Sequence, residues 1–226
     1  MAPSVVPMAT AGALAERLPA LAASEGTAGH EYPALLASAR GPEAMGDLAD
    51  AAHYLCVIHG RRPGVVDFAA DRTLHPGAGP WLDEAARGFA EERTYLARIV
   101  VAAGPLPSTP GQAETEAAVL GQRHALEMLA NSDRDGCALG AAIALVLDWW
   151  AIRRVLDVAA RKLDLEVPFC TLPNVVYSRD LARELGTMRS VERAMAFGAQ
   201  QVLLQHHGLW DLLEARQLAR SRAQAA

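Results

Sequence analysis

A chain of 226 residues, 51% hydrophobic but only 5% aromatic, is long enough to bury an aliphatic core without a disulfide or structural metal. Its net charge of −5 and its lack of basic runs exclude the usual kinds of nucleic-acid-binding protein. Cys56, Cys137 and Cys170 are far apart and form no C-x-x-C motif, so we expect reduced thiols in a cytoplasmic protein.

The predicted elements are almost all helical. In chain order, apolar periodicity and capping signals predict helices over residues 10–24, 30–40, 42–60, 80–104, 109–131, 135–163, 178–186 and 190–222. Thr109, Pro110 and Gln112 form a capping box that opens the fifth of these, and Ser178 is expected to cap the seventh. Only the short extended segment 173–177 hints at a strand.

These patterns predict an all-α protein. Residues 29–226 are expected to form a single-domain bundle of about six main helices, with a weakly ordered or peripheral helix in residues 1–28. A long central helix (about 135–163) is apolar almost all round, and a long C-terminal helix (about 190–222) follows. The longest apolar run, 137–147, is shorter than the roughly 20 residues of a bilayer span, so we expect no membrane insertion.

Asp148 interrupts the apolar sequence LVLDWWAI within the predicted central helix. Its neighbours at helical spacing are all apolar, namely Ala141, Ala144, Leu145, Ile152 and Val155. An unpaired carboxylate in such a place costs several kcal/mol. We therefore expect a specific partner on a neighbouring helix, either an arginine or a histidine, with the histidine bound directly or through a metal ion.

Four more ionisable residues fall on apolar helix faces, so that five helices each present one. The five candidate metal ligands are His59, Glu92, His124, Asp148 and His206. Imidazole and carboxylate groups are normal ligands of iron, manganese and zinc, so convergence of these faces would suit such an ion. The same set equally suits a hydrogen-bonded network without metal, and Glu92 alone can pair with an arginine from another helix.

Small and aromatic residues mark two other places. Gly208 in QHHGLW indicates close helix approach or a ligand against the backbone, and Gly198 indicates a tight helix crossing. Trp149 and Trp150 cover two helix faces, so either both pack in the core or one lines a pocket.

Three functions remain open at this point. The first is a helical protein with a buried site for a metal ion or small molecule, possessing in the metal form an O2-dependent oxidase or oxygenase activity. The second is a haem protein with His206 or His59 as the axial ligand and Trp149 or Trp150 lining the pocket. The third is a cofactor-free interaction or structural protein, such as a homodimer or an adaptor, whose buried charges fix helix packing. The chain lacks H-E-x-x-H, P-loop, G-x-S-x-G and paired Glu-x-x-His motifs.

Overall fold

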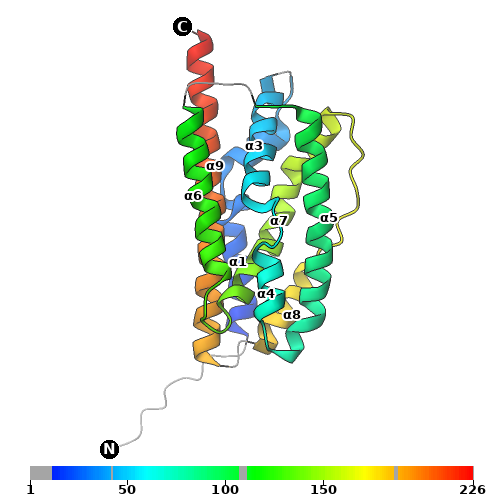
Figure 1. The fold of residues 1–226 in the computed structure, drawn as a ribbon, viewed down its shortest axis with the longest axis vertical. Helices are drawn as coiled ribbons and strands as arrows, with labels where there is room; N and C mark the ends of the chain where they lie inside the picture. Colours follow the sequence, from blue (N-terminus) through cyan, green and yellow to red (C-terminus); the bar gives the residue numbers. More distant parts are fainter. Residues whose placement is uncertain (1–11, 42, 107–110, 186–187, 226) are drawn as a thin grey trace, which may run out of the picture.

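The computed structural model describes residues 12–41, 43–106, 111–185 and 188–225, and all regular structure in them is helical (Figure 1). The elements are α1 (Ala13–Glu25), η1 (Thr27–Gly29), α2 (Glu31–Ser38), α3 (Glu43–His59), α4 (Val65–Arg72), η2 (Pro76–Ala78), α5 (Gly79–Ala103), α6 (Gln112–Ala130), α7 (Cys137–Lys162), α8 (Val175–Leu185) and α9 (Arg189–Ala225). The prediction of an all-α domain with long helices near 135–163 and 190–222 is confirmed. None of the described helices combines the length and apolar character that a bilayer crossing requires.

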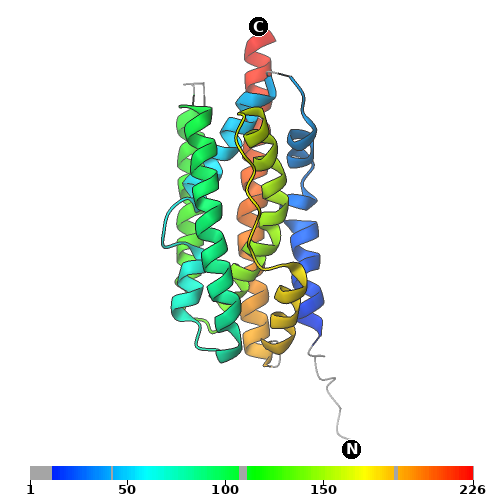
Figure 2. The same cartoon turned by 90° about the vertical axis from the view of Figure 1, so that its right-hand side faces the viewer.

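α7 forms the centre of the bundle because its sequence is apolar on every side. Every residue from Cys137 to Trp149 is buried. α7 packs most extensively against α9 and also contacts α1, α3, α4 and α5. α9 runs the length of the molecule beside it, and its C-terminal end extends beyond the other helices in both views (Figures 1 and 2).

The crossing of α7 and α9 depends on two glycines. A Cβ atom at Gly140 would lie 2.1 Å from the carbonyl oxygen of Met195, and one at Gly198 would lie 2.1 Å from that of Cys137. The tight crossing predicted at Gly198 is confirmed. Gly208 is different, because a Cβ atom there would meet no described atom closer than Nε2 of Gln122, at 3.3 Å. Close backbone approach therefore does not explain Gly208.

Gly140→Ala is expected to lower the free energy of unfolding by about 1–3 kcal/mol, because α7 and α9 must move apart to accept the methyl group. Gly121→Ala is the matched control, since a Cβ atom there meets nothing within 4 Å on the exposed face of α6. That change should stabilise the protein by about 0.5–1 kcal/mol through helix propensity. Urea denaturation measures both, and effects of the same sign would contradict the close crossing.

Several local predictions need correction. One face of α1, with Leu14, Ala15 and Leu18, is buried, and α1 packs against α8 and α9. The cap of α8 is Asn174, whose Oδ1 accepts the N–H of Tyr177 at 2.9 Å, and the faint strand signal in 173–177 is the start of this helix. Thr109 and Pro110 lie outside the described residues.

Ser178, the predicted cap of α8, has another role. It lies inside α8 and is buried, and its hydroxyl accepts the indole N–H of Trp81 at 3.1 Å. This side chain therefore joins α8 to α5 instead of starting a helix.

Candidate functional site

Asp148 is fully buried in α7 and accepts three hydrogen bonds. Its Oδ1 accepts the backbone N–H of Thr27 at 2.7 Å, and its Oδ2 accepts the Thr27 hydroxyl at 2.7 Å. Oδ2 also lies 2.6 Å from Nδ1 of His206 on α9. The expectation of a specific partner on a neighbouring helix is thus confirmed, and that partner is a histidine bound directly.

A third ionisable group extends this pair. Nε2 of His59, at the end of α3, lies 2.8 Å from Nε2 of His206, and both rings are buried. We call Asp148, His206 and His59 the buried triad. Three of the five residues predicted to converge therefore do so, in a hydrogen-bonded line from α7 through α9 to α3.

With both rings neutral, the hydrogen bonds assign the proton of each ring to one nitrogen. A carboxylate only accepts, so Nδ1 of His206 must donate to Asp148, and Nε2 of His206 is left with a lone pair. Nε2 of His59 must then donate to it. The remaining ring nitrogen of His59, Nδ1, is unprotonated in the neutral ring and has no hydrogen-bond partner among the described residues.

The segment between α1 and α2 completes the surroundings of Asp148. The indole N–H of Trp210 donates to the Thr27 hydroxyl at 2.9 Å, which directs the hydroxyl proton to Asp148. Gly26 makes the close approach possible, because a Cβ atom there would lie 2.3 Å from Oδ1 of Asp148. Sequence reasoning missed Gly26 and Thr27, since they lie in the short segment between α1 and α2, more than 100 residues from Asp148.

A small cavity lies beside His59. Its volume is about 20 Å³, enough for a water molecule or a small polar group. Phe89 and Arg93 of α5 and Arg123 of α6 also line it. The His59 ring contacts Phe89 and Trp149 edge-on, with centroid separations of 6.1 and 5.5 Å. We call this space the His59 cavity.

Burial lowers the pKa of His59 well below its usual value of 6.5, and the neighbouring His206 and Arg93 add to the effect. His59 is therefore neutral in the folded protein at neutral pH. The neutral ring of His59, a residue that lines the cavity, keeps a lone pair on Nδ1.

This lowered pKa predicts acid sensitivity. Below about pH 6.5 the unfolded chain takes up a proton at His59 while the folded protein does not, so stability falls as pH falls. Between pH 7.5 and 5.5 the loss from this group should be about 1 kcal/mol, and His59→Gln should remove it. Urea unfolding at both pH values checks this, and an unchanged pH dependence in the variant would assign the effect elsewhere.

Glu92 belongs to a second buried cluster that joins α5 to α7. Its Oε2 accepts the indole N–H of Trp149 at 2.8 Å, and its Oε1 pairs with Arg153. Arg153 also donates to Asp157 at 2.7 Å. Burial raises the pKa of Glu92, while the Trp149 hydrogen bond and the charge of Arg153 oppose the rise. Glu92 has thus found an arginine on another helix, the alternative open to it from sequence.

His124 does not join the site. Its side chain is 73% exposed on α6, near Glu127. Leu120 and Met128, the apolar neighbours that suggested an inward face, are themselves exposed. The buried stripe of α6 is a different one, so the inward placement of His124 is wrong.

The surroundings of His59 and His206 do not fit haem. A bound group of that size needs a pocket of several hundred Å³, and the His59 cavity has about 20 Å³. The Nε2 atoms of His59 and His206 also share a hydrogen bond instead of facing an open space. Trp149 is buried against Glu92, while Trp150 is 37% exposed, so neither indole lines a porphyrin-sized pocket.

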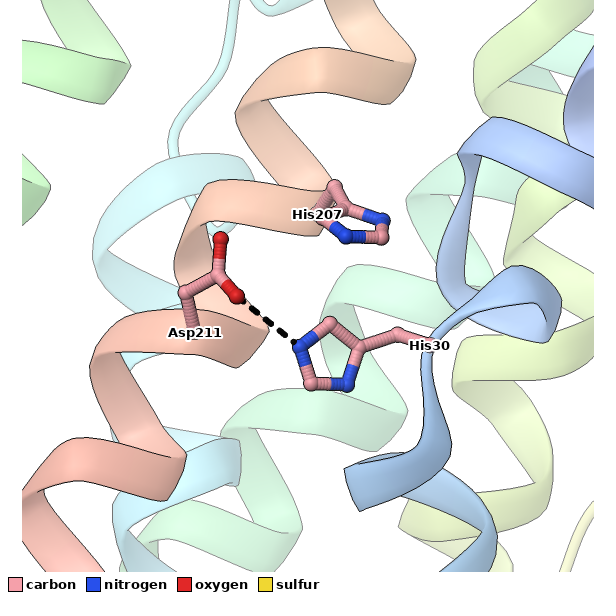
Figure 3. Close-up of side chains that lie close together, drawn as sticks. All are labelled: His30, His207 and Asp211. Atoms are coloured by element: carbon pink, nitrogen blue, oxygen red, sulfur yellow. Dashed lines mark hydrogen bonds and ion pairs between the residues drawn. The ribbon is translucent and has the colours of Figure 1, made fainter.

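Another group of ligand-type side chains lies where α9 meets the start of α2 (Figure 3). His207 and Asp211 are one helical turn apart on α9, and His30 comes from the start of α2. One ligand atom from each lies within 4.8 Å of the others. We call these three residues the His30 group. Sequence reasoning missed it, because only the spacing of His207 and Asp211 on α9 is visible without the fold.

The His30 group can hold a metal only with a rearrangement. Nδ1 of His30 accepts the backbone N–H of Tyr32 at 3.0 Å, so the proton of the neutral ring is on Nε2. That nitrogen lies 3.2 Å from Oδ1 of Asp211, to which it donates (Figure 3). A metal bound at Nε2 would displace this proton and disturb the cap of α2. In this structure the hydrogen bond between His30 and Asp211 links the start of α2 to α9.

Comparison with known proteins adds a family but no activity. No curated protein matches the sequence, and no solved structure matches it. Residues 22–221 match a family of unknown function (DUF6975). This range includes the buried triad, Glu92 and the whole His30 group, and the chain therefore belongs to that family.

Proposed function

We propose that the protein binds a small molecule in the His59 cavity, with Nδ1 of His59 accepting a hydrogen bond or a proton from it. The observation that supports this most is the buried triad, whose hydrogen bonds leave Nδ1 of His59 without a partner among the described residues, in a residue that lines a cavity. Three ionisable groups in an apolar core are costly to bury, so a role in binding or catalysis gives a reason for their presence.

The chemistry available to such a triad is general base catalysis. When Nδ1 of His59 takes a proton from a bound molecule, the ring becomes positively charged. Nε2–H of His59 donates to His206, and the carboxylate of Asp148 beyond it stabilises the positive charge. Asp148 also fixes the tautomer of His206, as the carboxylate does in Ser-His-Asp enzymes.

The test uses protein labelled with ¹⁵N in histidine. Small alcohols, amides, amines and carboxylic acids are added one at a time while the ring nitrogens are followed by NMR. We expect at least one class to shift Nδ1 of His59 and to leave the exposed His124 unchanged. A His59→Gln variant should bind the same compounds more weakly, because the contact with Nδ1 is lost. A folded protein whose His59 responds to none of them would contradict the proposal.

A divalent transition metal at the His30 group is a second candidate. Nδ1 of His207 is buried without a hydrogen-bond partner among the described residues, and it lies beside the ring of His30. Two histidines and one carboxylate suit zinc, manganese or iron, and iron with this ligand set would supply O2-dependent oxidation.

Elemental analysis of protein purified without chelator or nickel tests the second candidate. Near-stoichiometric iron, manganese or zinc, lost in Asp211→Ala but kept in Asp71→Ala, would establish the site. If the protein holds no metal and does not bind added Zn²⁺ or Mn²⁺, the His30 group only links α2 to α9.

If both candidates fail, the remaining proposal is an interaction protein whose buried charges fix its packing, and light scattering would then test for a homodimer.

A further inference from the structure

Arg93 lines the same cavity as His59 and is 92% buried, leaving 8% of its surface exposed. Its Nε donates to the carbonyl oxygen of His59 at 3.2 Å, and its Nη2 donates to Asp67 at 2.5 Å. Its third nitrogen, Nη1, is buried and has no hydrogen-bond partner among the described residues. Buried donors without a partner are rare, and they indicate a water, an ion or a ligand.

The charges around the cavity are mainly positive. Arg61, Arg93 and Arg123 line it, and Glu127 is the only acidic residue among its described lining. Nε of Arg123 lies 3.4 Å from Glu127, but in a direction that makes no hydrogen bond. A second guanidinium N–H at the cavity is therefore without an acceptor. Arginine recognises planar oxyanions such as carboxylates especially well.

The cavity thus pairs a donor with an acceptor. Arg93 offers an N–H to an anion, and His59 offers a lone pair to a proton donor. The two residues are neighbours, since Nε of Arg93 donates a hydrogen bond to the carbonyl oxygen of His59. We infer that the ligand is a small 2-hydroxycarboxylate, whose carboxylate accepts from Arg93 and whose hydroxyl donates to His59. The carboxylate half of this inference stands on Arg93 and Arg123, while the hydroxyl half rests on the proposed function.

The size and position of the cavity limit the ligand further. With about 20 Å³ available, it admits only a molecule of a few heavy atoms or the end group of a longer one. Arg61 and Glu127 are exposed members of its lining, so entry is from the surface between the α3–α4 loop and α6.

Four probes titrated into the wild-type protein test the ligand class. Glycolate has both groups, acetate lacks the hydroxyl, glycolamide lacks the negative charge, and inorganic phosphate is a tetrahedral anion. We expect glycolate to bind best and acetate about tenfold more weakly, since one hydrogen bond is lost. Glycolamide or phosphate binding as tightly as glycolate, or no binding of glycolate at all, would overturn the inference.

Variants then assign the contacts. Arg93→Gln should weaken glycolate binding about ten- to a hundredfold, because a charge-assisted hydrogen bond is lost. Arg98→Gln, an exposed arginine on the same helix, is the control and should change nothing. Arg93→Gln leaves the buried Asp67 without this partner, so Arg123→Gln serves as a second variant if the first does not fold. Normal glycolate binding in both folded arginine variants would contradict the inference.

His59→Gln separates the two claims. If His59→Gln makes the affinities for glycolate and acetate equal while both still bind, the inference and the proposed function both stand. If both anions bind as before, with their difference intact, carboxylate recognition stands and the role of His59 fails. If neutral compounds bind in a His59-dependent manner and anions do not, the role of His59 stands and the inferred ligand class fails.

Discussion

Asp148→Ala is expected to lower the free energy of unfolding by about 3–5 kcal/mol, because each buried donor that loses its acceptor costs roughly 1–3 kcal/mol. The change removes the acceptor of three hydrogen bonds at once. The Thr27 N–H and hydroxyl and Nδ1 of His206 would then lie buried without partners. Chemical denaturation followed by circular dichroism measures the effect.

Two further variants show whether the loss comes from the buried network. Asp148→Asn keeps an acceptor for Thr27 and should cost less than the alanine variant. Asp71→Ala removes an exposed carboxylate on α4 and should change the free energy of unfolding by no more than about 0.5 kcal/mol. A loss at Asp148 no larger than that at Asp71 would mean that Asp148 is not paired in the core.

Glu92→Ala should cost about 3 kcal/mol, toward the lower end of the range for buried pairs, because Arg153 keeps its bond to Asp157. The indole N–H of Trp149 also loses its acceptor. Asp83→Ala, an exposed acid on the same helix, is the control and should stay within about 0.5 kcal/mol.

Replacing both partners of this pair gives the more specific result. Glu92→Leu with Arg153→Leu should cost clearly less than Glu92→Ala, because no buried charge then lacks its partner. A double variant that is as unstable as the sum of its single changes would show that Glu92 and Arg153 act independently.

The sequence predicted the centre of the fold because its signals there are local. α7 is apolar on all sides over more than three turns, and this alone predicts a central helix. The same reasoning found Asp148, since a charge amid buried neighbours needs a partner. It could not choose between arginine and histidine, because the partner comes from a helix almost 60 residues away.

The failures have an equally physical origin. α6 has two apolar stripes, and local spacing does not say which one faces the core, so His124 was placed inward when it is exposed. Arg93 and Arg153 were not singled out, because a long side chain at the edge of an apolar stripe usually extends to solvent. Thr27 begins the three-residue helix η1 and His30 caps α2, and segments this short show no helical periodicity in the sequence.

The three functions left open by the sequence are of two kinds, a binding or catalytic site and a structural role, which make different demands on the five polar residues. A functional site required them to lie together around a cavity, and a purely structural role required separate local pairs. The structure meets each of these two demands in part. Asp148, His206 and His59 lie together with His59 beside a cavity, whereas Glu92 is paired with Arg153. The cavity beside His59 is what favours a functional site.

The most direct test of this account is the protonation state of the two buried histidines in the free protein. ¹⁵N chemical shifts of the ring nitrogens at neutral pH distinguish the two tautomers and the charged ring. The account predicts a proton on Nδ1 of His206, a proton on Nε2 of His59, and an unprotonated Nδ1 of His59. A proton on Nδ1 of His59, in either the neutral or the charged ring, would contradict it.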